Sequence, residues 1–126
     1  YCEKNLLEEG LKSFNQVTLY GKEADARRII DELSQFPMMA PKRVVILKEA
    51  QSIQKITDKL MPYLDHIVDT TVFVVCYKYK TTAAKKFIAK AKSKGVYFES
   101  KPLYENQIPD WIHNYLARKG FKITQK

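Results

Sequence analysis

Residues 42–51 read KRVVILKEAQ, and four consecutive apolar residues occupy positions 44–47. An uninterrupted apolar strand is typical of a sheet that helices cover on both faces, because a strand with one wet face alternates apolar and polar residues. Residues 71–77, TVFVVCY, have the same character. We therefore predict a parallel sheet buried between helices.

The segments around these two runs alternate between strand and helix patterns. Residues 14–20 predict a strand by their alternation, and residues 96–99 predict a fourth, short strand. Apolar residues at helical spacing predict helices over residues 1–9 (ending at Gly10), 25–36 (with Asp25 as N-cap), 52–64, 82–94 (ending at Gly95) and 107–119. This order predicts an α/β fold with a parallel, helix-flanked sheet and right-handed crossovers.

The strand-helix alternation stops after Pro102. We predict an α/β domain over residues 1–103, followed by a separate segment over residues 104–126. The latter is too short to bury a core, so its helix either packs back on the sheet or begins a second domain.

The composition limits the class of protein. The chain has 126 residues, and its 22 Lys and Arg exceed its 14 Asp and Glu. It contains no run near the ~20 apolar residues of a membrane helix, so we expect no membrane partner. Cys2 and Cys76 are far apart and lack metal-ligand spacing, which favours a reducing cytoplasm. The opening has no Met and no secretion signal, and we expect an excised piece of a longer protein.

The excess positive charge is concentrated in residues 78–101. Such a field favours polyanions, and the candidate DNA contacts are Lys78, Lys80, Lys85 and Lys86. A solvated lysine-rich helix face explains the same residues equally well.

Nucleotide hydrolysis is not expected, although many parallel α/β sheets bind nucleotides. The sequence contains no GxxxxGK[ST] phosphate loop. Lys48 stands where such a sheet would present a magnesium-holding acid, and Glu49 follows it. A cation there repels the metal, so these two residues predict an inactive nucleotide site. We expect no catalytic residue, metal or cofactor, and His66 and His113 receive no role.

A metal-dependent nuclease is the alternative enzyme. Glu99, Ser100 and Lys101 match the (D/E)xK end of a strand in restriction-type nucleases. The strand before it offers no Asp, and charges on an edge strand explain Glu99 and Lys101 as well.

Several longer stretches together resemble one family. They are FNQVTLYGKEAD (14–25), IIDELSQFPMMAPKRVVILKEAQ (29–51), TVFVVCYKYKT (71–81) and GVYFESKPLYENQIPDWIHNYLARKGFKI (95–123). Their order and spacing resemble the delta subunit of the bacterial DNA polymerase III clamp loader. The resemblance covers its N-terminal domain without the first strand and phosphate-loop region, plus the opening helix of a lid-like domain.

The resemblance implies an AAA+-like fold that does not bind ATP and has no intrinsic catalysis. The subunit would belong to the DNA polymerase III holoenzyme, a DNA-directed DNA polymerase active in cytoplasmic DNA replication. It would bind and open the sliding clamp (beta), together with gamma/tau-type and delta-prime-type subunits, around primed DNA.

The resemblance also implies a clamp-binding site. Two adjacent large apolar residues of the family enter a pocket on the clamp, and they match Met38 and Met39, flanked by Ser34, Gln35 and Phe36. Taken alone, the residues also fit a structural role, with Phe36 on the apolar stripe of its helix and both Met side chains tucked under the sheet. A plain DNA-binding α/β domain remains a third function.

One structural question follows from the resemblance. The family's first strand lies between the strands that match residues 71–77 and 96–99, and this chain is expected to lack it. Either the remaining strands close up in an altered order, or another copy fills the gap, or the correspondence is wrong at one end.

Overall fold

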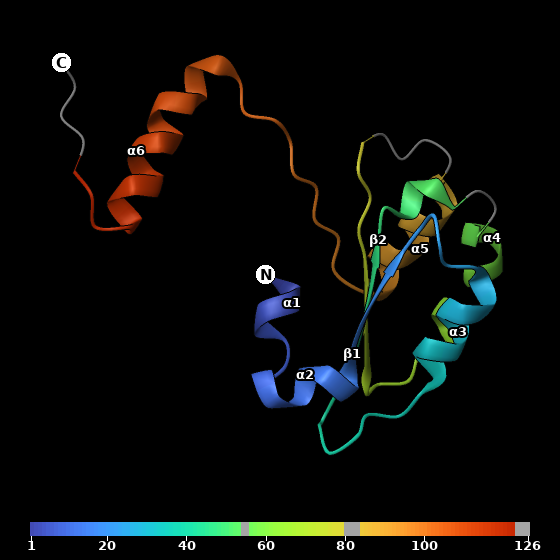
Figure 1. Cartoon of the computed structure of the whole chain (residues 1–126). Helices are drawn as coiled ribbons and strands as arrows, with labels where there is room; N and C mark the ends of the chain where they lie inside the picture. Colours follow the sequence, from blue (N-terminus) through green and yellow to red (C-terminus); the bar gives the residue numbers. More distant parts are fainter. Residues whose placement is uncertain (54–55, 80–83, 123–126) are drawn as a thin grey trace.

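The computed structural model describes residues 1–53, 56–79 and 84–122. Its centre is a sheet of three parallel strands in the order β1-β2-β3 (Figure 1). The strands are β1 (Gln16–Tyr20), β2 (Arg43–Lys48) and β3 (Thr71–Val75). The parallel sheet predicted from the two apolar runs is therefore confirmed.

Helices cover both faces of this sheet. Helices α3, α4 and α5 lie on one face, and the N-terminal segment with α1 and α2 lies on the other (Figure 1). The α-helices are α1 (Cys2–Asn5), α2 (Glu9–Asn15), α3 (Ala26–Ser34), α4 (Ile56–Leu60), α5 (Lys85–Lys94) and α6 (Ile108–Arg118). Short 3₁₀ turns are η1 (Ala50–Ser52), η2 (Tyr63–Asp65) and η4 (Glu105–Gln107).

The central strand β2 supplies two cores. Val45 and Leu47 point to the larger core, which also holds Ile29 and Leu33 of α3. Val44 and Ile46 point to the opposite face, where Leu7 covers them. All four apolar residues of β2 are at most 2% exposed, which explains why no polar residue interrupts the run.

Helix α3 begins as its sequence predicts. The Asp25 carboxylate accepts a hydrogen bond of 2.8 Å from the Arg28 backbone N–H, so Asp25 is the N-cap. The helix ends at Ser34, two residues earlier than predicted. Phe36 therefore lies beyond the helix and is 75% exposed, so the alternative that placed it on the apolar stripe of that helix is wrong.

Three other predicted boundaries need correction. Gly10 lies in the first turn of α2 and ends no helix, and Phe14 belongs to that helix rather than to the first strand. The single helix predicted over residues 52–64 is interrupted, since Pro62 separates α4 from the 3₁₀ turn η2. Residues 54–55 lie outside the described chain.

The strand predicted over residues 96–99 is wrong. This segment has no regular structure, with Val96 99% and Phe98 86% exposed. A strand needs a neighbour for its backbone hydrogen bonds, and β3 pairs only with β2 among the described residues. The preceding helix ends as predicted, where the Gly95 N–H donates to the Ala91 carbonyl.

The predicted last helix is confirmed as η4 followed by α6. It stands apart from the sheet (Figure 1), and its Trp111 and Tyr115 rings stack on each other with centroids 5.2 Å apart. That residues 104–126 begin a separate domain stays a prediction. In the part of the chain that the structure describes, every helix is too short or too polar to cross a membrane.

Candidate partner-binding loop

Large apolar side chains are exposed on the loop between α3 and β2, here called the Met loop (residues 35–42). Met39 is 96% and Met38 60% exposed, and the neighbouring Phe36 is 75% exposed. The structure thus presents the two Met side chains to solvent rather than under the sheet. The alternative in which both Met side chains tuck under the sheet is therefore wrong.

The flanking residues of the predicted site are also accessible. Ser34 ends α3, where its hydroxyl donates to the Ile30 carbonyl and shares a 3.0 Å hydrogen bond with the Tyr63 hydroxyl. Gln35 is exposed at the C-cap position. Ser34 therefore fixes the start of the loop, whereas the Gln35 side chain is free to face a partner.

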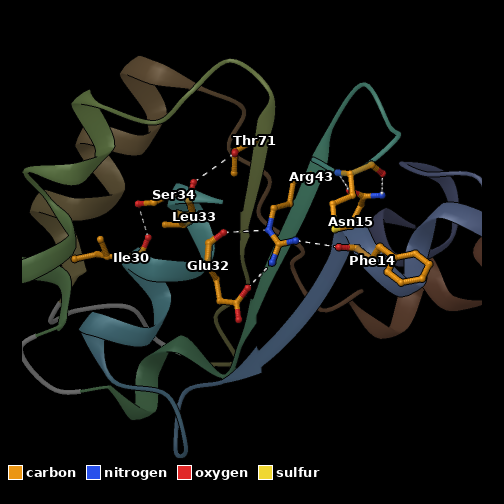
Figure 2. Close-up of polar contacts among 9 residues, drawn as sticks. Phe14, Asn15, Ile30, Glu32, Leu33, Ser34, Arg43 and Thr71 are labelled. Atoms are coloured by element: carbon orange, nitrogen blue, oxygen red, sulfur yellow. Dashed lines mark hydrogen bonds and ion pairs between the residues drawn. The ribbon is translucent and has the colours of Figure 1, made fainter. Parts of the chain in front are cut away.

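A buried arginine holds the other end of the Met loop. The Arg43 guanidinium donates to the Glu32 carbonyl (3.1 Å) and to the Phe14 carbonyl (3.0 Å), and it pairs with the Glu32 carboxylate (Figure 2). Arg43 is 6% exposed. It joins the ends of α2, α3 and the start of β2 at the amino edge of the sheet.

The structure adds Phe14 to the surface near this loop. Phe14 is 64% exposed. The sequence had predicted it only as part of a strand and not as a surface residue of the site. Its neighbour Asn15 contacts the backbone of Met38, so Phe14 lies beside the Met loop. No local pattern could have indicated this, because 23 residues separate Asn15 from Met38.

Lys48 and Glu49 lie at the opposite, carboxyl edge of the sheet. The Lys48 ammonium pairs with the Glu3 carboxylate at 2.6 Å. The hydrogen bond from Lys48 lowers the pKa of Glu3, and the same bond raises the pKa of Lys48. Lys48 is thus a paired cation at this edge, and its place at a metal-holding position stays a prediction.

Backbone geometry around Glu49 is unusual. Glu49 has a left-handed backbone with φ 53°, and its carbonyl oxygen would lie 2.2 Å from a Cβ on Gly21. Only a glycine permits this close approach between the end of β1 and the end of β2.

Among the described residues, no three His, Cys, Asp or Glu side chains lie together as possible metal ligands.

The candidate DNA contacts also lie near the carboxyl edge. Lys78 follows β3, and the exposed Lys85 and Lys86 begin α5. Lys80 lies outside the described residues. Farther along α5, Lys90 and Lys94 pair with Asp65 at 2.5 and 3.6 Å. The lysines at the beginning of the helix are therefore the ones more accessible to a polyanion.

The fold and the exposed loop define a class of protein: an α/β module with a cation, Lys48, at the carboxyl edge of its parallel sheet and an apolar loop exposed at the other end. The family model described as "DNA polymerase III, delta subunit" matches residues 2–101. The chain belongs to this family.

A solved structure supports the same fold. The chain is similar to the "Bacillus subtilis DNA clamp loader delta protein (YqeN)", with a TM-score of 0.74 and 23% sequence identity. The match covers 94% of this chain and 38% of that one, so the predicted AAA+-like fold is confirmed and the chain spans well under half of that protein. A search of curated proteins gave no significant match.

Proposed function

We propose that this chain is the clamp-binding module of a clamp-loader delta subunit. It binds the sliding clamp through Met38 and Met39 and opens one interface of the ring. The family membership supports the partner, and the exposure of the two adjacent Met side chains supports the contact. The latter is the observation that carries the proposal.

Methionine suits this contact. Its unbranched, polarisable side chain adapts to irregular apolar pockets. Interfaces gain most of their binding energy from a few apolar anchors that are fully desolvated. A Met at 96% exposure has nearly its whole side chain available for such burial.

The module itself would carry out no catalysis. Lys48 occupies the position of the metal-holding acid, and its pairing with Glu3 fixes that positive charge in place. ATP would therefore act through the gamma/tau-type and delta-prime-type subunits, which control access of the module to the clamp around primed DNA. The complex would work in the cytoplasm.

A titration calorimeter tests the contact directly. We compare the wild-type chain with the Met38→Ala/Met39→Ala double variant for binding to the cognate clamp. Burying about one and a half Met side chains contributes about 3 kcal/mol, so the double variant should lose about 100-fold in affinity. Equal affinities would exclude the Met loop as the anchor.

Tyr79→Ala is the matched control. Tyr79 is 83% exposed and follows β3 at the carboxyl edge, away from the Met loop. Its replacement removes an exposed apolar side chain of larger size and should leave clamp affinity unchanged. An equal loss in both variants would indicate nonspecific apolar association.

A DNA contact is a second candidate function of the same module. Lys78, Lys85 and Lys86 are exposed, and among the described residues none of them takes part in an ion pair. Neutralising Lys85 and Lys86 should reduce the salt slope of DNA binding by about 2. An unchanged salt slope would show that Lys85 and Lys86 do not contact the DNA phosphates.

The nuclease alternative has lost its structural premise. Glu99 and Lys101 lie on an irregular segment outside the sheet, and among the described residues Glu99 accepts one long hydrogen bond, 3.5 Å from the Tyr97 hydroxyl. The motif requires its acid at the end of a strand. Incubating the chain with plasmid DNA and Mg²⁺ or Mn²⁺ is the direct check, and cleavage would restore this alternative.

A further inference from the structure

The residue that contacts the Met loop most closely from outside is Asn15, at the end of α2. It is fully buried, with 0% exposure. Its Nδ2 donates to the Met38 carbonyl at 2.8 Å, and its Oδ1 accepts from the Met38 backbone N–H at 2.6 Å (Figure 2). The side chain therefore pairs with both backbone groups of one loop residue.

This pairing resembles one step of a strand ladder. A carboxamide offers a donor and an acceptor side by side, and a residue backbone offers the complementary pair. Asn15 Nδ2 also donates to the Leu11 carbonyl at 3.0 Å, which anchors the amide to α2. Both ends of the side chain amide are satisfied without water.

The exposed residue that follows Met38 has an uncommon backbone conformation. Met39 has a left-handed backbone with φ 54°, which a non-glycine residue adopts only when its surroundings impose it. Met38 is fixed by Asn15 on one side, and Arg43 holds the end of the loop on the other. Residues 35–42 are thus ordered without belonging to a helix or strand.

We infer that Asn15 is a positioning residue for clamp binding. This inference rests on the proposed function of the Met loop. Because Asn15 is fully buried and bonds to the Met38 backbone, it acts through that backbone by holding both Met side chains in their binding arrangement. Binding then requires less ordering of the loop.

Hydrogen exchange, followed by NMR in the free chain, tests the positioning without the clamp. In Asn15→Ala the Met38 amide loses its acceptor and should exchange at least about tenfold faster, the factor expected for one lost hydrogen bond. The Val45 amide within β2 should keep its protection. Unchanged exchange of the Met38 amide in Asn15→Ala would overturn the inference.

Two further variants define the effect. Asn15→Asp keeps the side-chain volume and the Oδ1 acceptor, but an ionised carboxylate would set its second oxygen against the Met38 and Leu11 carbonyls. The variant is therefore measured in acidic buffer, where the protonated carboxyl donates in place of Nδ2 and Met38 should retain most of its protection. It also serves if Asn15→Ala fails to fold, because a carboxyl group that protects Met38 no better than other loop amides would count against the inference. Asn5→Ala is the control, since Asn5 is an exposed helical Asn that bonds only to the Tyr1 carbonyl.

A double-mutant cycle with the clamp separates positioning from general stability. Asn15→Ala should weaken clamp binding about tenfold in the wild-type background. In the Met38→Ala/Met39→Ala background it should have no further effect, because the side chains that it positions are gone. A full additional loss in that background would assign Asn15 a merely structural role.

The cycle also distinguishes the two proposals. If the double Met variant binds the clamp as the wild type does, the proposed function fails, whereas the exchange data still decide whether Asn15 orders the loop. If the double Met variant loses affinity and Asn15→Ala does not, only the positioning role fails.

Discussion

Replacing Arg43 by Met tests whether the amino edge of the sheet depends on one buried cation. Among the described residues the Arg43 side chain makes three hydrogen bonds, two to backbone carbonyls and one to the Glu32 carboxylate. Its side chain is 8% exposed and that of Glu32 is 20% exposed. Methionine keeps an apolar stem similar to that of arginine but removes the guanidinium and every donor.

The magnitude follows from what remains behind. The carbonyls of Glu32 and Phe14 lose their partner, and the Glu32 carboxylate stays largely buried without its counter-ion. Breaking a buried ion pair on one side costs about 3–5 kcal/mol. For a chain of this size that corresponds to a decrease in Tm of roughly 10–20 °C.

Urea denaturation followed by circular dichroism measures the loss. Lys42→Met is the control, because the adjacent Lys42 is exposed and its replacement should change stability by less than about 0.5 kcal/mol. Glu32→Gln should cost less in the Arg43→Met background than in the wild type, since it then removes an unpaired charge. A loss below about 1 kcal/mol for Arg43→Met would refute this reasoning.

Three further changes have defined outcomes. Gly21→Ala places a Cβ 2.2 Å from the Glu49 carbonyl oxygen and should destabilise the chain by at least about 2 kcal/mol in urea denaturation. Asp25→Ala removes the N-cap of α3 and should cost about 1 kcal/mol, measured in the same way; an unchanged midpoint would contradict the cap. The hydrogen bond from Lys90 lowers the pKa of Asp65, so this carboxylate stabilises the fold above its ordinary pKa and loses that effect as the pH falls through the lowered value. Asp65→Asn should therefore be slightly less stable than the wild type at pH 7, and the difference should vanish in strongly acidic buffer.

Local patterns predicted the elements that local physics determines. The uninterrupted apolar run of β2 indicated a strand with two buried faces, and both faces proved to be core. The Asp25 cap and the apolar spacing after it predicted α3. These signals are readable because each depends on residues within one or two turns of chain.

Features that depend on distant partners were not readable. Residues 96–99 have the composition of a strand, but a strand exists only where another strand supplies hydrogen bonds. Gly10 looked like a helix end, yet the next seven-residue helix includes it. The Asn15 contact with Met38 joins positions 23 residues apart, so no motif announces it.

For the candidate site the sequence was informative only together with a family resemblance. Apolar loop residues are common on protein surfaces, and Met38 and Met39 alone gave no reason to prefer binding over packing. Only the three-dimensional structure shows that both side chains are exposed. For Lys48 the sequence alone was enough to make a prediction. A positive charge at a position that would hold a metal predicts that Mg²⁺ does not bind there.

Oxidative footprinting of the three methionines tests the central claim most directly. Met38 and Met39 are exposed, whereas Met61 packs against the core and serves as the internal reference. The experiment uses the wild-type chain, because hydroxyl radicals oxidise Met in the native protein and mass spectrometry locates the sulfoxides. Adding the cognate clamp should protect both Met38 and Met39 and leave Met61 unchanged. A stable complex in which Met38 and Met39 oxidise as fast as in the free chain would contradict the account.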